Sequence, residues 1–96
     1  MKITDFKGWK FINQGNTLVL TTNSDGMAIL HTSDIASIVQ HGTTVIIYMN
    51  NRYEYHGCFM SIDISKKLLM QYLKLLENQY KTLDYSDINN NEGELI

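Results

Sequence analysis

Residues 43–57, "TTVIIYMNNRYEYHG", constrain the fold of this 96-residue chain more than any other segment. Two runs rich in β-branched and aromatic residues flank Asn50-Asn51, and this pattern predicts a β-hairpin. If the two asparagines form a two-residue turn, Tyr48 pairs with Tyr53 and Ile46 pairs with Tyr55.

Both faces of this predicted hairpin carry apolar side chains. One face carries Thr44, Ile46, Tyr48, Tyr53 and Tyr55. The opposite face carries Val45, Ile47, Met49, Arg52, Glu54 and His56. Because an antiparallel sheet usually leaves one face to water, something must cover each face of this one.

The chain before the hairpin is divided by turn signals. "QGN" at 14–16, "NSDG" at 23–26 and "HG" at 41–42 separate strand-like runs. "SDIASIVQ" at 33–40 continues a strand, although "SDIASI" also fits a brief helical turn capped by Ser33 or Asp34. Short connections favour hairpins, so we expect an antiparallel meander of about five strands.

The apolar pattern becomes helical after Met60. A helix from about 64 to 82, capped by Asp63 or Ser65, is predicted by the spacing of Leu69, Tyr72, Leu73, Leu76, Tyr80 and Leu83. Residues 85–96 lack this period and read as a flexible acidic tail. The expected fold is therefore α+β: a single domain over 1–84, with one C-terminal helix packed on the antiparallel sheet.

Self-association is predicted because one helix covers only one face of a sheet. Leu68 and Leu75 also make the helical stripe wider than usual. We therefore expect a homo-oligomer, a dimer or higher, with Leu68, Leu75, Ile47 and Met49 at its interface. The alternative is a sheet that curls into a half-barrel and buries both faces without a partner.

Composition argues against several functional classes. Cys58 is the only cysteine, and His31, His41 and His56 lack the spacing of metal ligands, so we expect no metal, no cofactor and no enzymatic activity. A net charge of −2 without a basic stripe argues against nucleic-acid binding. No apolar run is long enough to span a membrane and no secretory signal is present, so we expect a cytoplasmic protein.

Arg52 is the only arginine in the chain. It stands at the hairpin end beside Tyr53 and near Tyr48 and His56. Arginine with aromatic residues can clamp a phosphate or carboxylate and stack on a base. These four residues are therefore the candidate partner- or ligand-binding site. The alternative is a tip that serves only solubility.

Residues 28–75 resemble the FlbD-like small proteins of swarming motility. The resemblance consists of a strand, an "I-x-x-I" element at Ile35 and Ile38, a hairpin with Thr44, Ile46 and Asn50, and a serine-started helix. Asn51 replaces the glycine that is usual in that hairpin. The plan of a sheet followed by a helix is also similar to small phage anti-defence proteins.

The expected function is that of a non-enzymatic binding protein that occupies a protein partner. Such a protein would be, for example, a phage-encoded inhibitor of a host or defence protein. One alternative is sequestration of a small anionic, nucleotide-like signal molecule through Arg52 and the neighbouring tyrosines. Another, implied by the FlbD resemblance, is a small flagellar or regulatory accessory protein.

Overall fold

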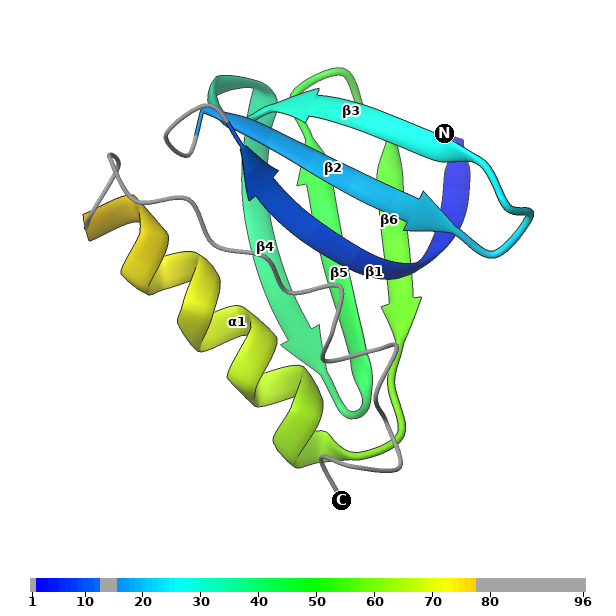
Figure 1. Ribbon diagram of the computed structural model, residues 1–96, viewed down its shortest axis with the longest axis vertical. Coiled ribbons are helices and arrows are strands. Elements are labelled where there is room, and N and C mark those ends of the chain that lie inside the picture. The colour runs from blue at the N-terminus through cyan, green and yellow to red at the C-terminus, as the bar shows by residue number, and fades with distance from the viewer. Residues whose placement is uncertain (1, 13–15, 78–96) are drawn as a thin grey trace.

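A computed structural model describes residues 2–12 and 16–77 (Figure 1). Its elements are β1 (Ile3–Ile12), β2 (Thr17–Thr22), β3 (Met27–His31), the 3₁₀ turn η2 (Thr32–Asp34), β4 (Ile35–His41), β5 (Thr44–Met49), β6 (Glu54–Cys58) and α1 (Ile62–Glu77). The α+β class with one C-terminal helix is confirmed, with six strands in place of about five. The acidic tail over 85–96 lies outside the described residues.

The six strands form one mixed sheet in the order β3-β2-β1-β6-β5-β4. Each half of the sheet is an antiparallel meander, as predicted. The halves join through a parallel pairing of β1 with β6, from Ile3 opposite Glu54 to Phe6 opposite Gly57. The extra strand arises because η2 separates β3 from β4. The predicted strand is confirmed from Ile35 onward, whereas Ser33 and Asp34 belong to the 3₁₀ turn η2.

The sheet curls so that the inner face of β1–β3 is opposite the inner face of β4–β6, and the strands of the two halves cross (Figure 1). A β-bulge interrupts the pairing of β1 between Phe6 and Gly8, and another interrupts β4 between Ile35 and Ser37. Such bulges bend strands and increase their twist. Both halves supply the core, which contains Phe6, Trp9, Phe11, Leu18, Leu20, Leu30, Val45, Ile47, Met49, Phe59, Ile64, Leu68 and Tyr72. The sheet therefore curls as the half-barrel alternative predicts, but the curl buries the inner face alone, and Ile46 and Tyr48 on the outer face stay half-buried.

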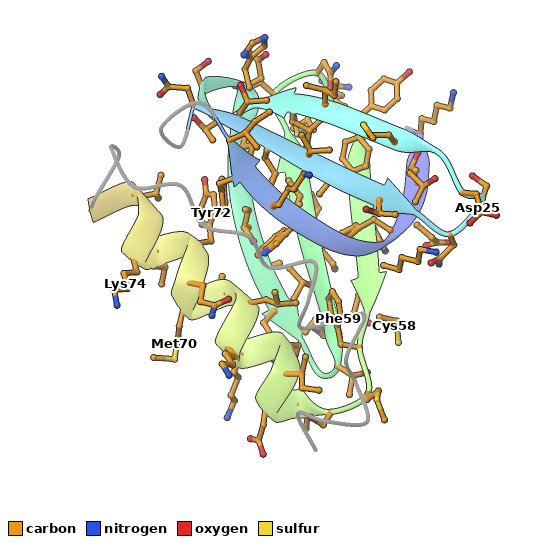
Figure 2. The ribbon with its side chains drawn as sticks, in the orientation of Figure 1. Asp25, Cys58, Phe59, Met70, Tyr72 and Lys74 are labelled. Atoms are coloured by element: carbon orange, nitrogen blue, oxygen red, sulfur yellow. The ribbon has the colours of Figure 1, made fainter. Side chains whose placement is uncertain are left out.

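Helix α1 packs against β4 and β5 and directs Ile64, Leu68 and Tyr72 into the core. The Tyr72 ring connects the helix to the other half of the sheet, because its centroid lies 6.4 Å from that of Trp9 and 6.0 Å from that of Phe11, both on β1. The helix thus fills the open side of the curled sheet (Figure 2). Within the described residues, no helix is long and apolar enough to cross a bilayer.

The start of α1 differs from the prediction by two residues. Ser61 caps the helix, since its Oγ accepts a hydrogen bond of 3.2 Å from the Ile64 backbone N–H. Ser65, predicted as a possible cap, is instead fully buried in the first turn. Its hydroxyl lies 3.0 Å from the Gly42 carbonyl oxygen and accepts a hydrogen bond from Gln40, which ties the helix to the β4–β5 turn. The predicted helix end at about 82 lies outside the described residues.

Candidate binding pocket

The β5–β6 hairpin has a longer loop than predicted. The Met49 N–H donates to the Tyr53 carbonyl (2.9 Å), and the Arg52 N–H donates to the Met49 carbonyl (3.1 Å). Arg52 has φ 70°, in the left-handed region. This is the loop of three residues in which a turn is followed by one left-handed residue. The predicted two-residue turn is therefore wrong.

The longer loop changes which side chains share a face. In the observed register Tyr48 pairs with Glu54 and Ile47 pairs with Tyr55. Because side chains alternate along a strand, a shift of one residue moves the second strand's side chains to the opposite face. Tyr53 and Tyr55 therefore lie on the inner face with Met49, and both pack against the core.

The four residues proposed as one site are accordingly divided. Tyr48 and His56 lie on the outer face, where His56 Nε2 is 2.8 Å from Glu54 Oε1. Arg52 is exposed at the hairpin end. Only Tyr53 faces the interior of the curled sheet, so the structure does not bring the predicted cluster together.

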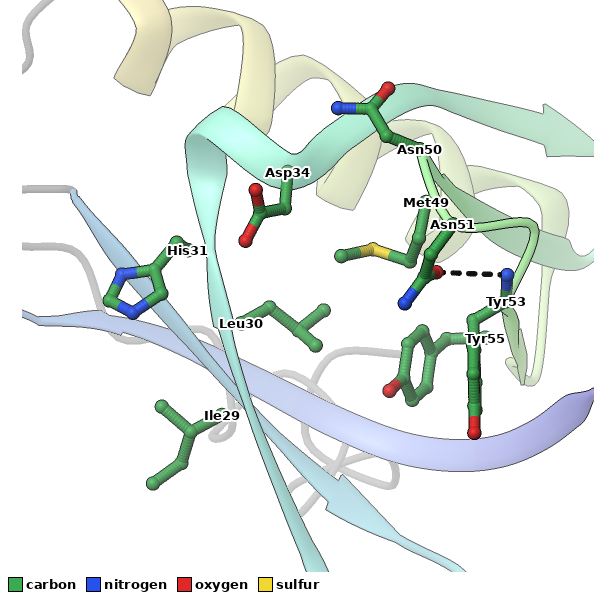
Figure 3. A pocket seen from close by; sticks show the side chains of 9 residues that line it. All are labelled: Ile29, Leu30, His31, Asp34, Met49, Asn50, Asn51, Tyr53 and Tyr55. Carbon is green, nitrogen blue, oxygen red and sulfur yellow. Dashed lines mark hydrogen bonds between the residues drawn. The ribbon is translucent and has the colours of Figure 1, made fainter.

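Tyr53 instead belongs to a cavity of about 420 Å³ at the mouth of the curled sheet (Figure 3). The cavity lies where the end of β3 and η2 face the β5–β6 loop. Its lining residues are Ile29, Leu30, His31, Asp34, Met49, Asn50, Asn51, Tyr53 and Tyr55. Leu30 and Met49, both buried, belong to the core, and the other lining residues are more exposed.

Hydrogen bonds fix the two sides of this mouth relative to each other. The Asn50 backbone N–H donates to the Asp34 carbonyl oxygen (2.9 Å), and Asn50 Nδ2 donates to the Ser33 carbonyl oxygen (3.3 Å). Asn51 Oδ1 accepts a hydrogen bond of 3.1 Å from the Tyr53 N–H (Figure 3). The loop is thereby held against η2, which preforms the pocket.

The side chains of the pocket combine aromatic rings with one carboxylate. Figure 3 shows the rings of Tyr53 and Tyr55 side by side with both hydroxyl oxygens on the same side, and the Asp34 carboxylate across the cavity, turned toward His31. Burial is the larger cause that raises the pKa of Tyr55, and the nearby Tyr53 raises this pKa further. The phenol is therefore neutral at neutral pH. No lysine or arginine is among the lining residues.

One cation lies next to the pocket without lining it. Lys2 Nζ is 5.9 Å from the centroid of the Tyr53 ring, within the range of a cation–π interaction. The backbone of Lys2 is held in place because its carbonyl oxygen accepts a hydrogen bond of 2.9 Å from the Glu54 N–H.

Three of the four residues predicted at an oligomer interface, Ile47, Met49 and Leu68, lie in the core of a single chain. Ile47 and Leu68 are 0% and 1% exposed, and Met49 forms part of the pocket floor. The side chain of Leu75 lies outside what the structure describes. Curvature covers the inner face of β5, whereas Ile46 and Tyr48 on its outer face stay half-buried. Self-association stays a prediction that must involve other residues.

Several large apolar side chains of α1 remain on its surface. These are Ile62, Met70, Leu73 and Leu76, of which Met70 is 67% exposed. The over-wide apolar stripe that the sequence predicts thus exists, although Leu68 belongs to its buried part.

Sequence reasoning missed most of the pocket. Tyr55 was assigned to the wrong face through the turn, and Asp34 was interpreted only as a cap or turn residue. Asn50 and Asn51 were correctly placed in the turn, but their closeness to η2 depends on the pairing of distant strands. In the described ranges, no group of three His, Cys, Asp or Glu side chains is arranged to hold a metal ion.

Comparisons with protein-family models, with curated proteins and with solved structures give no match.

Proposed function

We propose that the chain is a non-enzymatic, cytoplasmic binding protein that occupies a protein partner, such as a host or defence protein. In this proposal the mouth pocket receives an anchoring side chain of that partner. The observation that supports it is a preformed cavity of about 420 Å³ with two tyrosine rings on its wall. Tyrosines in well-packed pockets are common binding hot spots, and mouths of β-barrels are frequent binding sites.

The lining favours binding over catalysis. It offers His31 and Asp34 as ionisable groups with a proton-transfer capacity, but no serine, cysteine or lysine that they could activate. The hydrogen bonds between the loop and η2 hold the cavity open before a partner arrives. Preformed cavities reduce the entropic cost of binding.

The alternative of a small anionic, nucleotide-like ligand has weaker support. The tyrosine rings could stack on a base, but Arg52 does not line the cavity and the Asp34 carboxylate opposes an anion. Lys2 and Arg52 are then the cations left to attract a phosphate from outside the lining.

Matched tyrosine variants test the proposal. Tyr53→Ala removes a ring from the pocket, whereas Tyr48→Ala removes a ring from the outer face of the same hairpin. Both tagged variants and the unmodified protein are used to capture proteins from a lysate of the source organism. We expect a protein retained by the unmodified chain and by Tyr48→Ala, with at least about tenfold less on Tyr53→Ala, since hot-spot truncations cost about 2 kcal/mol or more.

Melting curves of both variants show whether each remains folded. Equal retention by all three chains would place the binding surface elsewhere. Loss only with Tyr48→Ala would assign it to the outer face of the hairpin.

A further inference from the structure

We propose that the mouth pocket selects a guanidinium group, so that the anchor of the partner is an arginine side chain. This inference rests on the proposed function, because it names the chemistry of the group that the pocket receives. It follows from the charge of the lining, the arrangement of the tyrosines and the position of Lys2.

The charge of the lining favours a cation. The exposed carboxylate of Asp34 lines the cavity on the side of His31 (Figure 3), and neither lysine nor arginine lines it. Within residues 2–12 and 16–77, the ion pairs join Lys7 to Asp25 and His56 to Glu54, so Asp34 has no cation in this part of the chain. A carboxylate without a cation accepts two parallel hydrogen bonds from a guanidinium group.

The remaining polar atoms suit a planar donor group. The side-chain amide of Asn51 lies beside the tyrosine rings, whose phenol oxygens point away from it (Figure 3), and the Asn50 amide donates to the Ser33 carbonyl oxygen. Guanidinium is planar, carries five N–H donors and stacks on aromatic faces. The Tyr53 and Tyr55 rings offer such faces, while Leu30 and Met49 offer apolar contact for the methylene stem of an arginine.

A cation of the chain itself lies close to one of these rings. The ammonium group of Lys2 lies 5.9 Å from the centroid of the Tyr53 ring, although its exposed side chain is free to extend into water. Because Lys2 lies outside the lining, it leaves the cavity free but places a like charge near an incoming cation. Lys2 and Asp34 therefore have opposite effects on any charged ligand. Removing each charge in turn shows whether the pocket prefers a cation or an anion.

The test uses N-acetyl-L-arginine methylamide as the probe, titrated against the full chain and followed by NMR signals of the tyrosine rings. N-acetyl-L-lysine methylamide and adenosine monophosphate serve as comparison ligands. We expect the arginine probe to bind in the millimolar range, several-fold more tightly than the lysine probe, with shifts at Tyr53 and Tyr55 and none at Tyr48.

Two variants then report the sign of the charge effect. Asp34→Asn should weaken binding of the arginine probe roughly threefold to tenfold, since a hydrogen bond to a charged group is lost. Lys2→Gln should strengthen it, because a like charge is removed. If Asp34→Asn does not fold, the Lys2→Gln result decides alone, since it changes only an exposed side chain.

Opposite signs would overturn the inference: tighter binding of adenosine monophosphate, improved by Asp34→Asn and weakened by Lys2→Gln, would assign the pocket to anions. Absence of any arginine-probe shift at tens of millimolar would also overturn it. The proposed function fails separately, through the capture experiment with Tyr53→Ala. A partner captured through Tyr53 together with an inert arginine probe would leave the function standing and reject only the guanidinium.

Discussion

Asp25 and Arg52 are the two non-glycine residues with positive φ in the described chain, at 62° and 70°. Each ends a hairpin loop of the same design. In the first loop the Thr22 N–H donates to the Gly26 carbonyl, and the Asp25 N–H donates to the Thr22 carbonyl. In the second loop the Met49 N–H donates to the Tyr53 carbonyl, and the Arg52 N–H donates to the Met49 carbonyl. Aspartate tolerates this conformation, whereas an arginine side chain does not stabilise it. Arg52 thus has a conformational cost that its side chain does not offset.

Substitutions at Arg52 should therefore change stability through the backbone. Arg52→Gly removes the steric cost of the left-handed conformation and is expected to be neutral or stabilising by up to about 1 kcal/mol. Arg52→Val adds a β-branched side chain and should destabilise the protein by about 1–2 kcal/mol. Urea denaturation measures both. Equal stability of the two variants would contradict the left-handed assignment.

This loop also explains why the sequence predicted the hairpin but not the site. "Asn50-Asn51" is a strong turn signal, and it correctly placed the hairpin between two strands. Nothing in the local sequence marks Arg52 as left-handed, so a two-residue turn fits equally well. Because one residue more in the loop reverses the faces of β6, a small local ambiguity moved Tyr53 and Tyr55 to the wrong side.

Gly57 is required by packing at the junction of the two sheet halves. A Cβ atom at this position would lie 2.5 Å from Phe6 Cζ and 3.0 Å from Phe59 Cε2. Gly57→Ala should therefore overpack the core and cost about 1–3 kcal/mol in the free energy of unfolding. Chemical denaturation provides the measurement.

A second substitution tests the physical cause. Phe6→Leu removes the ring atoms that the new methyl group would meet, so Gly57→Ala should cost clearly less in the Phe6→Leu background. The difference between the two backgrounds is the coupling energy of a double-mutant cycle. Strict additivity of the two changes would show that the clash is not the cause.

At the scale of elements, α1 has one face that belongs to the core and one that does not. Leu68 is 1% exposed and Leu73 is 51% exposed, so two leucines of the same helix form a matched pair. Leu68→Ala should cost about 2–5 kcal/mol, the usual range for a buried leucine. Leu73→Ala should stay within about 0.5 kcal/mol. Thermal and urea unfolding of both variants at one protein concentration give the comparison.

The same pair separates the core role of Leu68 from the interface role that the sequence predicts for it. A loss of stability that is independent of protein concentration indicates packing within one chain. If the stability difference between the unmodified protein and Leu68→Ala disappeared at low protein concentration, Leu68 would belong to an interface, since the stability of an oligomer depends on concentration.

The order of the strands was only partly predictable. Local alternation and turn residues identify β2, β5 and β6, and helical spacing identifies α1. The parallel pairing of β1 with β6 joins Ile3 to Glu54, and no local signal reports a contact between residues so far apart. The Ser61 cap was missed because Asp63 and Ser65 are equally good capping residues by type.

At the scale of the whole molecule, curvature replaces the second subunit as the cover for the inner face of β5. The sequence showed that two apolar faces required two covers, but bulges and distant pairings decide how far a sheet curls. Among the apolar side chains that the described residues leave exposed are those on the outer side of α1, with Met70 and Leu73 between lysines. The homo-oligomer stays a prediction, and this outer side is now its candidate surface.

Charge makes the prediction of assembly specific. If two copies of α1 pack antiparallel about Met70, Lys66 of one copy lies opposite Lys74 of the other, and these like charges oppose the apolar contact. Salt screens such exposed charges, so association should be stronger at about 1 M salt than at low salt.

Light scattering at tens of micromolar should then show a mass above that of the 11.1 kDa monomer. Leu73→Asn should lower this mass, whereas Met27→Ser, which changes an even more exposed apolar residue on β3, should leave it unchanged. A monomer at every salt concentration would exclude self-association, and equal effects of both variants would exclude α1 as its surface.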